Sequence, residues 1–484
     1  MPPTKNAQQG SHDRPTLQIS VTSTSHYQKN NLISRILGVG TGDPKKTTVS
    51  AFPQQIVART VSAFLPADYK NSVTPEYLTY AKWQFVHNVL GSASGVLATQ
   101  AMLYAMGLGA GALPLSAAIN WVIKDGFGQF GGVVYATMVG QKFDSDPKHL
   151  RFWSTVWLQT ATWLEMLTPL FPHLFLVIGS VANIGKNISW LAMSATKASI
   201  NKTFCLKENL GDLTAKHGSQ ATAAGLIGTA IGILIGAATD ISIYTLILGF
   251  VPISFASLWG NYRSLLYTIT PTLNVERSRL MLNDAIAHSA DGQLVFSPEL
   301  LKTPRQVSVV ERFMREISHV EAQGLRPGIV VSPKLDQLHR DVRLYRGADS
   351  GQACVSRMIN DAFNKPAVDG ASKAYYVGYL PQSAANSSIS GNLYLWFSTR
   401  AGNKDTLLGF YHALVLRQLI GDHSSRSGSS HVSNTAVIAD LEDRAHEFVE
   451  CTADVFCDSV VQQGWDVTTM YFSKKSDQVE VEVI

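Results

Sequence analysis

The stretch PLSAAINWVIKDGFGQFGG at 114–132 lies at the centre of a long apolar run and decides how the chain folds. Apart from Lys124 and Asp125 inside it, no lysine, arginine, aspartate or glutamate occurs between Lys82 and Lys142. Removing an ion from water costs roughly several kcal/mol unless it finds a partner or reaches water. The adjacent lysine and aspartate are therefore predicted to have a specific structural or functional role.

The residues around this pair are predicted to form a helix that glycines interrupt. Asn120, Lys124 and Gly128 recur every four residues and so share one helical face. Adjacent helical residues point about 100° apart, so Lys124 and Asp125 are expected to find partners elsewhere in the fold. A broken helix that holds polar groups at depth is one way in which membrane proteins build a site.

The other charges embedded in the apolar region are the candidate counter-ions. We expect Glu165 to pair with Lys124, and Lys186 with Asp125. The predicted substrate-binding set is Asn120, Lys124, Asp125, Glu165, Asn183, Lys186 and Asp240. Two alternatives stay open: the charges are a salt-bridge network that fixes helix packing, and the polar patch at 183–187 caps a helix or faces water.

The composition indicates a membrane-embedded region. Charged residues make up 16% of the chain and the mean hydropathy is +0.06, which is too apolar for an ordinary soluble enzyme. Segments 218–239 and 241–262 contain no charge, and each can cross about 30 Å of hydrocarbon. They form either a hairpin that turns near Asp240 or one long kinked helix. A tightly packed soluble helical core is the alternative for the small-residue segment 91–111.

Helix packing in this region is predicted from glycine spacing. The glycines at 228, 232 and 236 lie one turn apart, so Gly228, Gly232 and Gly236 are expected to pack against another helix. His87 is predicted to be a hydrogen-bonded core histidine.

The charged and aromatic segments that flank this region have compositions that predict their surroundings. The segment 142–151 is expected to be a solvated loop. Tryptophans at 153, 157 and 163 form either an interfacial belt or part of a core. The lysine-rich segment 197–217 is expected to face the cytosol or its organellar equivalent.

The sequence from residue 271 onward is typical of a soluble fold. Amphipathic spacing predicts a helix from Asn274 to His288, and alternation predicts strands at 373–380 and 392–398. Helices are expected at about 403–420 and 437–463, with a further strand near 465–473.

The predicted fold class is thus mainly α, a helical and polytopic membrane domain followed by a small α+β domain. The predicted divisions are a disordered or targeting segment at 1–50, a helical core at 51–270, a helical connector at 271–330 and an α+β domain at 331–484. Residues 1–50 have no secretory h-region, and both plain disorder and an organellar transit peptide fit them.

Several classes of chemistry are disfavoured. A dispersed net charge of +4 does not indicate a nucleic-acid surface. Four cysteines without a CxxC pair predict neither a zinc site nor a disulfide framework. The glycine pattern at 126–131 matches the dinucleotide fingerprint, but its lead-in is helical rather than a strand. No catalytic or metal-ligating residue is predicted, and the cofactor is left open.

Several segments together resemble the root UVB sensitive (RUS) family. They include FLPADYKNSVTPEYLTY at 64–80, GVLATQAMLYAMGLG at 95–109, NWVIKDG at 120–126 and AKHGSQAT at 215–222. The resemblance runs to about Asp240 and, more loosely, to GFYHAL at 409–414. The family has no assigned reaction; its plant members are linked to seedling development, UV-B sensitivity, auxin transport and vitamin B6 homeostasis in plastids. The resemblance therefore implies a physiological link and no particular chemistry.

The sequence and the resemblance together favour an integral membrane protein in small-molecule transport or metabolite homeostasis. Its expected partners are the lipid bilayer and a second copy or another family member, with no nucleic acid, and its expected location is a membrane, organellar or otherwise. The alternative is a non-enzymatic helical scaffold, soluble or peripheral to a membrane. A pyridoxal phosphate lysine at Lys124 or Lys186 is disfavoured, because no phosphate-binding α/β pattern surrounds either residue.

Overall fold

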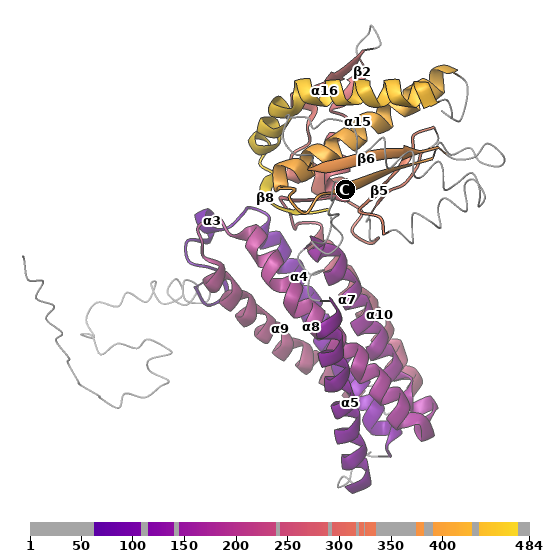
Figure 1. The fold of residues 1–484 in the computed structure, drawn as a ribbon. Coiled ribbons are helices and arrows are strands. Elements are labelled where there is room, and N and C mark those ends of the chain that lie inside the picture. The colour runs from indigo at the N-terminus through magenta and orange to yellow at the C-terminus, as the bar shows by residue number, and fades with distance from the viewer. Residues whose placement is uncertain are drawn as a thin grey trace, which may run out of the picture. The chain divides into compact units, whose positions relative to one another are not determined.

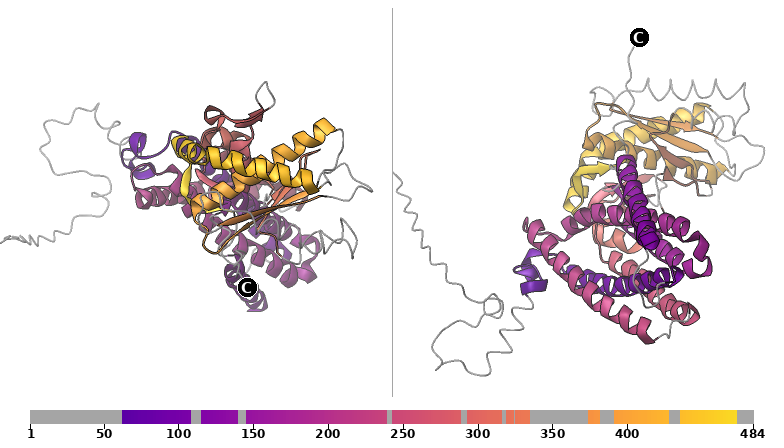
Figure 2. Two further views of the ribbon diagram at one scale, coloured as in Figure 1. Left: turned by 45° about the horizontal axis from the view of Figure 1, so that its top comes forward. Right: turned by 90° about the horizontal axis from the view of Figure 1, so that it is seen from below.

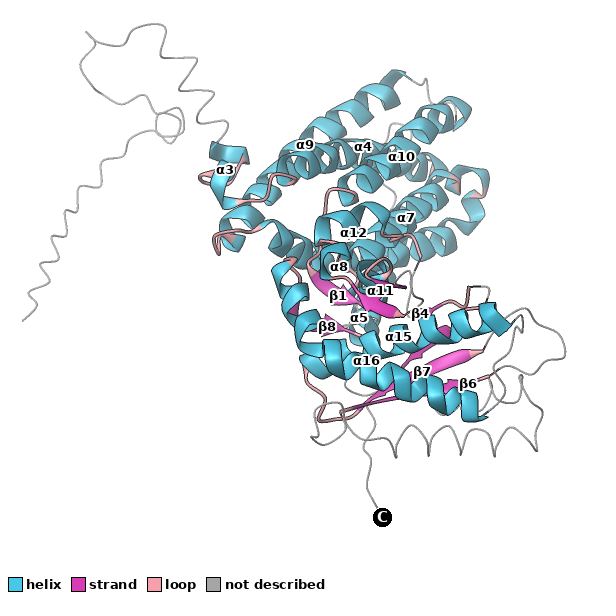
Figure 3. Ribbon diagram, turned by 90° about the horizontal axis from the view of Figure 1, so that it is seen from above, coloured by secondary structure: helices cyan, strands magenta, loops and turns pink. Residues whose placement is uncertain are grey.

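A computed structural model describes residues 62–107, 115–139, 145–238, 243–288, 293–315, 319–323, 325–334, 374–381, 391–427 and 435–472. The described residues between 62 and 265 are mainly helical, and the named strands lie from residue 272 onward (Figures 1 and 3). The N-terminal helices are α3 (Tyr69–Ser72), α4 (Tyr77–Ala105), α5 (Leu115–Val139), α7 (Pro147–Met166), α8 (Phe175–Phe204), α9 (Leu210–Ala238) and α10 (Ile243–Leu265). Two short 3-10 helices, η1 (Thr168–Leu170) and η2 (Pro172–Leu174), join α7 to α8.

Helix α4 is the centre of the helical part. It packs along α9 and α10 and also contacts α7, while α8 packs along α7 and α5 (Figures 1 and 2). His87 of α4 is buried, and its Nδ1 lies 3.0 Å from the Ser257 carbonyl oxygen of α10. The predicted core histidine is therefore confirmed, and a polar contact holds two long helices in register.

Glycines set the spacing between α4 and α9. A Cβ at Gly232 would lie 2.8 Å from Val96 Cβ and 2.9 Å from the Ala93 carbonyl oxygen, and one at Gly228 would collide with the Val89 carbonyl oxygen. Gly236 faces Gln100 of α4 in the same way. The three glycines thus lie on the face of α9 that approaches the α4 backbone.

The helical part exposes many large apolar side chains, with Leu226 70% and Leu248 74% exposed. Its interior combines a small apolar cluster around Leu97 and Phe250 with buried polar side chains. These polar side chains are Gln84, Gln159, Ser254, Ser257, Asn261 and Ser264. Three helical segments in the described part of the chain, Pro172–Phe204, Leu210–Ala238 and Ile243–Leu265, are long and apolar enough to cross a membrane.

The tryptophans of α7 divide between the two expected roles. Trp157 is largely exposed, whereas Trp163 donates from Nε1 to Ser254 Oγ at 2.9 Å and packs edge-on against Phe250. Trp153 donates to the Met314 carbonyl oxygen. One tryptophan is thus available for an interfacial position, while Trp163 fills the space between α7 and α10.

The C-terminal part contains a four-stranded sheet of order β4-β5-β7-β6 (Figure 3). Its strands are β4 (His319–Val320), β5 (Gly328–Val331), β6 (Tyr375–Leu380) and β7 (Asn392–Phe397). β5 runs parallel to β7, and the other neighbouring pairs are antiparallel. Helix α15 (Asn403–Ser427) packs on β6 and β7, and α16 (Thr435–Gln462) packs on α15. These two helices and the β6–β7 pair confirm the elements predicted from the sequence.

Residues 272–310 are built into the same hydrophobic core. Strand β1 (Thr272–Asn274) pairs in parallel with β8 (Asp466–Tyr471), the predicted last strand. Leu273 and Val275 share one buried cluster with Phe410 and Phe456. The segment predicted as a helical connector therefore contributes strand pairing and core residues to the C-terminal part.

One helix was predicted too long. The expected helix at 274–288 ends at Leu282 as α11 (Val275–Leu282), and β2 (Ile286–His288) then pairs with β3 (Leu294–Phe296). The structure continues with η3 (Pro298–Leu300) and α12 (Pro304–Val310). Val275, Met281 and Leu282 of α11 are buried. The helical spacing of apolar residues therefore predicts the structure correctly only for the first half of the segment.

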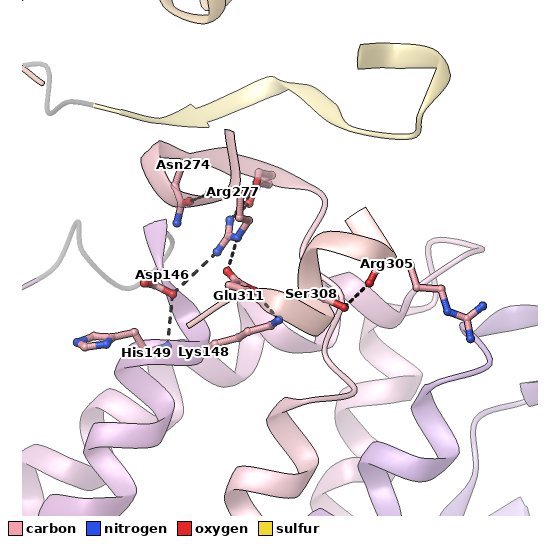
Figure 4. Close-up of polar contacts among 9 residues, drawn as sticks. Asp146, Lys148, His149, Asn274, Arg277, Arg305, Ser308 and Glu311 are labelled. Atoms are coloured by element: carbon pink, nitrogen blue, oxygen red, sulfur yellow. Dashed lines mark hydrogen bonds and ion pairs between the residues drawn. The ribbon is translucent and has the colours of Figure 1, made fainter. Parts of the chain in front are cut away.

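A buried ion network joins the start of α7 to the residues around α11 and α12 (Figure 4). Glu311 accepts from Lys148 Nζ at 2.6 Å and from Arg277 Nε at 2.7 Å, and Arg277 Nη2 lies 3.9 Å from Asp146 Oδ1. Asp146 also caps α7 by accepting from the His149 backbone N–H at 3.4 Å. Arg277 and Lys148 are fully buried.

This network corrects the prediction of a solvated loop at 142–151. Residues 147–151 are the first turn of α7, and Lys148 and Arg151 are both buried; residues 142–144 lie outside the described residues. Charge alone suggested solvent exposure, but a carboxylate more than 160 residues away supplies the partner that makes burial of Lys148 tolerable.

The network shifts the acidity of its carboxylates. Burial alone would raise the pKa of Glu311, but the Lys148 ammonium and the Arg277 guanidinium outweigh it and hold the pKa at about 2. Burial raises the pKa of Asp146, and the more distant Arg277 opposes that shift only in part. Glu311 is therefore the anion on which the two cations depend.

We predict that Gly232→Ala destabilises the protein by about 1–3 kcal/mol, because the new methyl group must displace the α4 backbone or Val96. Thermal unfolding of the purified protein in detergent measures the effect. Gly218→Ala, on the same helix with nothing within 4 Å of the added Cβ, is the control and should be neutral or slightly stabilising. Equal melting temperatures for the two variants would contradict close packing at Gly232.

We predict that Glu311→Gln lowers the free energy of unfolding at pH 7 by about 3–5 kcal/mol, because it leaves buried Lys148 without a carboxylate and buried Arg277 with only the more distant Asp146. The matched control is Glu321→Gln, whose surface pair with Arg315 is worth at most about 1 kcal/mol.

The pH dependence gives a second readout for Glu311. A folded-state pKa of about 2, below the ordinary value of 4.5, stabilises the protein fully above about pH 4.5 and progressively less as the pH falls toward 2. The wild type should therefore lose stability over that window more steeply than Glu311→Gln. Parallel pH profiles would show that Glu311 is not the titrating group.

Candidate functional site

A cavity of about 630 Å³ opens between α4, α7, α8 and α9. Its polar lining comes mainly from Arg151 and Gln159 of α7, Lys186 and Lys197 of α8, and His217 of α9. The lining spans twelve residues on α7 (151–162) and twelve on α8 (186–197), which corresponds to about 16 Å along each helix axis. The cavity is thus an elongated space within the helical part.

Arg151 is the most unusual group in the cavity. Its residue is only 8% exposed, and Nη1 donates to the Met193 carbonyl oxygen at 2.8 Å. Its Nε is buried and has no hydrogen-bond partner in the described part of the chain. A buried guanidinium normally pairs with a carboxylate, because an unpaired ion is costly away from water.

The lining as a whole is cationic. Arg151, Lys186 and Lys197 face the cavity, and no aspartate or glutamate among the described residues does. Only Lys186 has a carboxylate partner, Glu165, which it contacts from α8 across to α7. His217 is held by Asn201, with Nδ1 3.0 Å from Asn201 Oδ1. Two of the three lining cations therefore lack an acidic partner among these residues.

The residues predicted from the 114–132 stretch form a separate cluster between α5 and α8. Lys124 Nζ lies 2.6 Å from Asp125 Oδ1 and 4.6 Å from the centroid of the Trp121 ring. Asn183 donates its side-chain amide to the Lys124 carbonyl oxygen at 3.1 Å and to Asp125 Oδ1 at 3.2 Å. Gly128 allows this approach, because a Cβ there would collide with the Asn183 side chain.

The expected pairing of the embedded charges is wrong. Lys124 pairs with Asp125, and Lys186 with Glu165, rather than Lys124 with Glu165 and Lys186 with Asp125. Helices α5 and α7 both pack on α8, so Lys124 lies against α8 at Gly179 and Glu165 contacts Lys186 of α8 rather than Lys124. Although adjacent helical residues point in different directions, the lysine stem is long enough to bring its ammonium back to the neighbouring carboxylate.

The remaining predicted residues lie either near the Lys124–Asp125 cluster or in the cavity lining, except for Asp240. Asn120 lies half-buried on α5, one turn before Lys124. Lys186 lies on α8, three residues from Asn183, and lines the cavity. Asp240 lies outside the described residues. The structure thus places Lys124, Asp125 and Asn183 together and brings Lys186 to Glu165, in two distinct clusters.

Sequence reasoning missed Arg151, Lys197 and His217. A signal was available on α7, because one polar side chain recurs every three or four residues among aromatic ones: Arg151, Thr155, Gln159, Thr162 and Glu165. All five are buried. A polar stripe on a helix of this kind indicates an interior lined with polar groups.

Comparison with known proteins places the chain in a family. Residues 51–289 match the family described as the vitamin B6 photo-protection and homoeostasis domain. The chain is 27% identical over 369 residues to protein root UVB sensitive 3 of Arabidopsis thaliana, covering 76% of this chain and 77% of that protein. The chain belongs to the root UVB sensitive (RUS) family.

Further relatives cover the chain to different extents. Protein root UVB sensitive 6 of Arabidopsis thaliana is 27% identical over 448 residues, covering 88% of this chain and 80% of the relative. Protein root UVB sensitive 2, chloroplastic, is 28% identical over 271 residues, covering 56% of this chain but only 61% of the relative. No solved structure matches. The RUS-family region at 51–289 contains the whole cavity lining.

The two lysine pairs should respond differently to mutation. Lys186→Met leaves Glu165, whose side chain is 4% exposed, buried without its cation, and should destabilise the protein by about 3–5 kcal/mol. Lys124→Met leaves Asp125, whose side chain is 43% exposed and keeps its hydrogen bond from Asn183, and should destabilise the protein less than Lys186→Met. Thermal unfolding in detergent measures both.

A double variant separates charge loss from packing loss. Adding Glu165→Gln to Lys186→Met removes the stranded carboxylate and should restore most of the lost stability. Equal destabilisation by the two single variants, or no recovery in the double variant, would contradict the assignment of Lys186 as the partner that Glu165 requires.

Proposed function

We propose that this RUS-family protein is an integral membrane protein whose helical part binds a small polar metabolite in the cavity, for transport or metabolite homeostasis. The observation that carries the proposal is the distribution of side chains on the helices: many large apolar side chains face outward, while polar side chains are buried between the helices beside a smaller apolar core. A soluble protein would expose little contiguous apolar surface, whereas lipid is a suitable environment for such a surface.

The outward surface supports insertion at the level of single helices. Val177 on α8, Leu234 on α9 and Phe255 on α10 are each more than half exposed, and they lie on the three segments long enough to span a bilayer. The buried side of α10 carries three serines and Asn261 together with Leu246, Phe250 and Leu265. This arrangement favours lipid outside and a partly polar interior.

The cavity supports a solute-binding role. Charged and amide groups inside a membrane domain are costly and generally mark a ligand or ion site. The family description links the domain to vitamin B6, so B6 vitamers are the first solutes to test. The chloroplast named for one relative makes an organellar membrane the proposed location.

A second candidate function is a membrane-bound scaffold. Helix α5 has α8 as its main neighbour, and it exposes Val122, Phe130 and Val133. That apolar face suits lipid, but it also suits a second copy of the chain or another RUS protein.

Extraction and uptake measurements test the proposal. We expect the full-length protein to stay in the membrane pellet after alkaline carbonate treatment and, in proteoliposomes, to take up a B6 vitamer above protein-free vesicles. Ser194→Trp, which fills the cavity lining, should abolish uptake, while Ser219→Trp, an exposed position on α9 outside the lining, should not. Release by carbonate would exclude an integral protein. Retention without uptake would favour the scaffold.

A further inference from the structure

We propose that the cavity between α4, α7, α8 and α9 binds a phosphate group, held by Arg151 and Lys197. The inference rests on the proposed function for its setting in a membrane, and it adds the chemical class of the ligand. It is carried by two cations that face the cavity without an acidic partner among the described residues.

The charge balance of the helical interior calls for an anion. Around α7 and α8, other buried cations have a carboxylate: Lys148 and Arg277 share Glu311, and Lys186 pairs with Glu165. In the C-terminal part, buried Arg417 is instead bound by the backbone carbonyl oxygens of Pro327 and Glu321. Arg151 and Lys197 stand apart from these carboxylate pairs while facing the same space. Two like charges in a setting of low dielectric repel each other, so an anion that enters between them gains from both.

The guanidinium of Arg151 is prepared for such a ligand. A hydrogen bond of 2.8 Å from Nη1 to the Met193 carbonyl oxygen fixes the orientation of the guanidinium, and the buried Nε has no hydrogen-bond partner among the described residues. Arginine binds phosphate and carboxylate through two parallel N–H donors in a planar fork. The ligand therefore finds a donor already desolvated and already oriented.

The number of uncompensated charges favours phosphate over a single carboxylate. Glu165 neutralises Lys186, which leaves one charge on Arg151 and one on Lys197. A phosphate monoester carries a charge of roughly −1.5 to −2 at pH 7 and balances both cations. A monocarboxylate would leave one of them uncompensated.

Two sources could supply this phosphate: a soluble phosphate ester and a lipid with a phosphomonoester head group. Both place the same oxygens between Arg151 and Lys197, and the cavity volume of about 630 Å³ admits the phosphate end of either. Measurements with soluble and lipid probes distinguish the sources.

Binding to the full-length protein in detergent tests the inference. Isothermal titration with inorganic phosphate and with glycerol 3-phosphate should show saturable binding, while acetate and glycerol should not compete. Short-chain phosphatidic acid provides the lipid arm: stronger binding than glycerol 3-phosphate identifies a lipid, and equal or weaker binding identifies a soluble ester. Absence of saturable binding by all three phosphate probes would overturn the proposal.

Variants assign the binding to the two cations. Lys197→Gln should raise the dissociation constant at least about tenfold, the loss of one charge-assisted contact, and Lys197→Arg should retain binding. Lys202→Gln, an exposed lysine on the same helix outside the cavity lining, is the matched control and should bind like the wild type. Equal affinity of Lys197→Gln and Lys202→Gln would overturn the assignment.

Arg151 needs a test that does not depend on full stability. Arg151→Lys keeps the charge but loses the planar fork, so phosphate should raise its melting temperature less than that of the wild type. If phosphate raises the melting temperature of Arg151→Lys as much as that of the wild type, Arg151 does not bind the phosphate through its guanidinium fork. Uptake of a neutral solute without phosphate binding would reject this inference and leave the proposed function intact. Phosphate binding by a protein that carbonate extracts from the membrane would support the phosphate site and reject the proposed function.

Discussion

The position of Glu311 between two buried cations is the constraint on which the helical part depends. Its carboxylate binds Lys148 at the start of α7 and Arg277 in α11, and the same segment accepts a hydrogen bond from Trp153 at the Met314 carbonyl oxygen. These contacts fix where α7 begins and how it is rotated. The rotation of α7 about its axis places Arg151 and Gln159 on the side that faces the cavity. Glu311 therefore influences the geometry of a site whose lining residues all lie between 87 and 225.

Buried charge is used in two ways in this protein. In ion pairs such as Lys148–Glu311 and Lys186–Glu165, the attraction between the charges offsets the cost of desolvating them. Such pairs contribute little net stability compared with apolar residues, so their main effect is to specify how the helices are arranged. Arg151 is different, since its charge is buried without a carboxylate among the described residues. Burying this guanidinium costs free energy, and the binding of an anionic ligand would offset that cost.

The sequence predicted those parts of the fold that depend on local patterns. Helical spacing and alternation located α15, α16, β6 and β7, since each carries its own periodicity. Partners distant in sequence escaped prediction: the pairing of β1 with β8 and the contact of Lys148 with Glu311. The pairing of Lys124 with its neighbour Asp125 was missed for another reason, because the direction of the Cα–Cβ bonds does not limit the reach of a long lysine side chain. For the site, Lys186 and Glu165 were recognised as embedded charges, whereas Arg151 was assigned to a solvated loop because the buried partners of its neighbours lie beyond residue 270.

The cavity itself follows from the way neighbouring helices choose their partners. Helices α8 and α9 are joined by a short turn at 205–209, yet α8 packs along α7 while α9 packs along α4. The glycines of α9 draw it against the α4 backbone, and Gly185 of α8 lies close to Ala161 of α7. Because small residues hold each helix to a different neighbour, α8 and α9 separate beyond their connecting turn. The space between them is lined by side chains of α4, α7, α8 and α9, and the charged ones among them are the cations of α7 and α8.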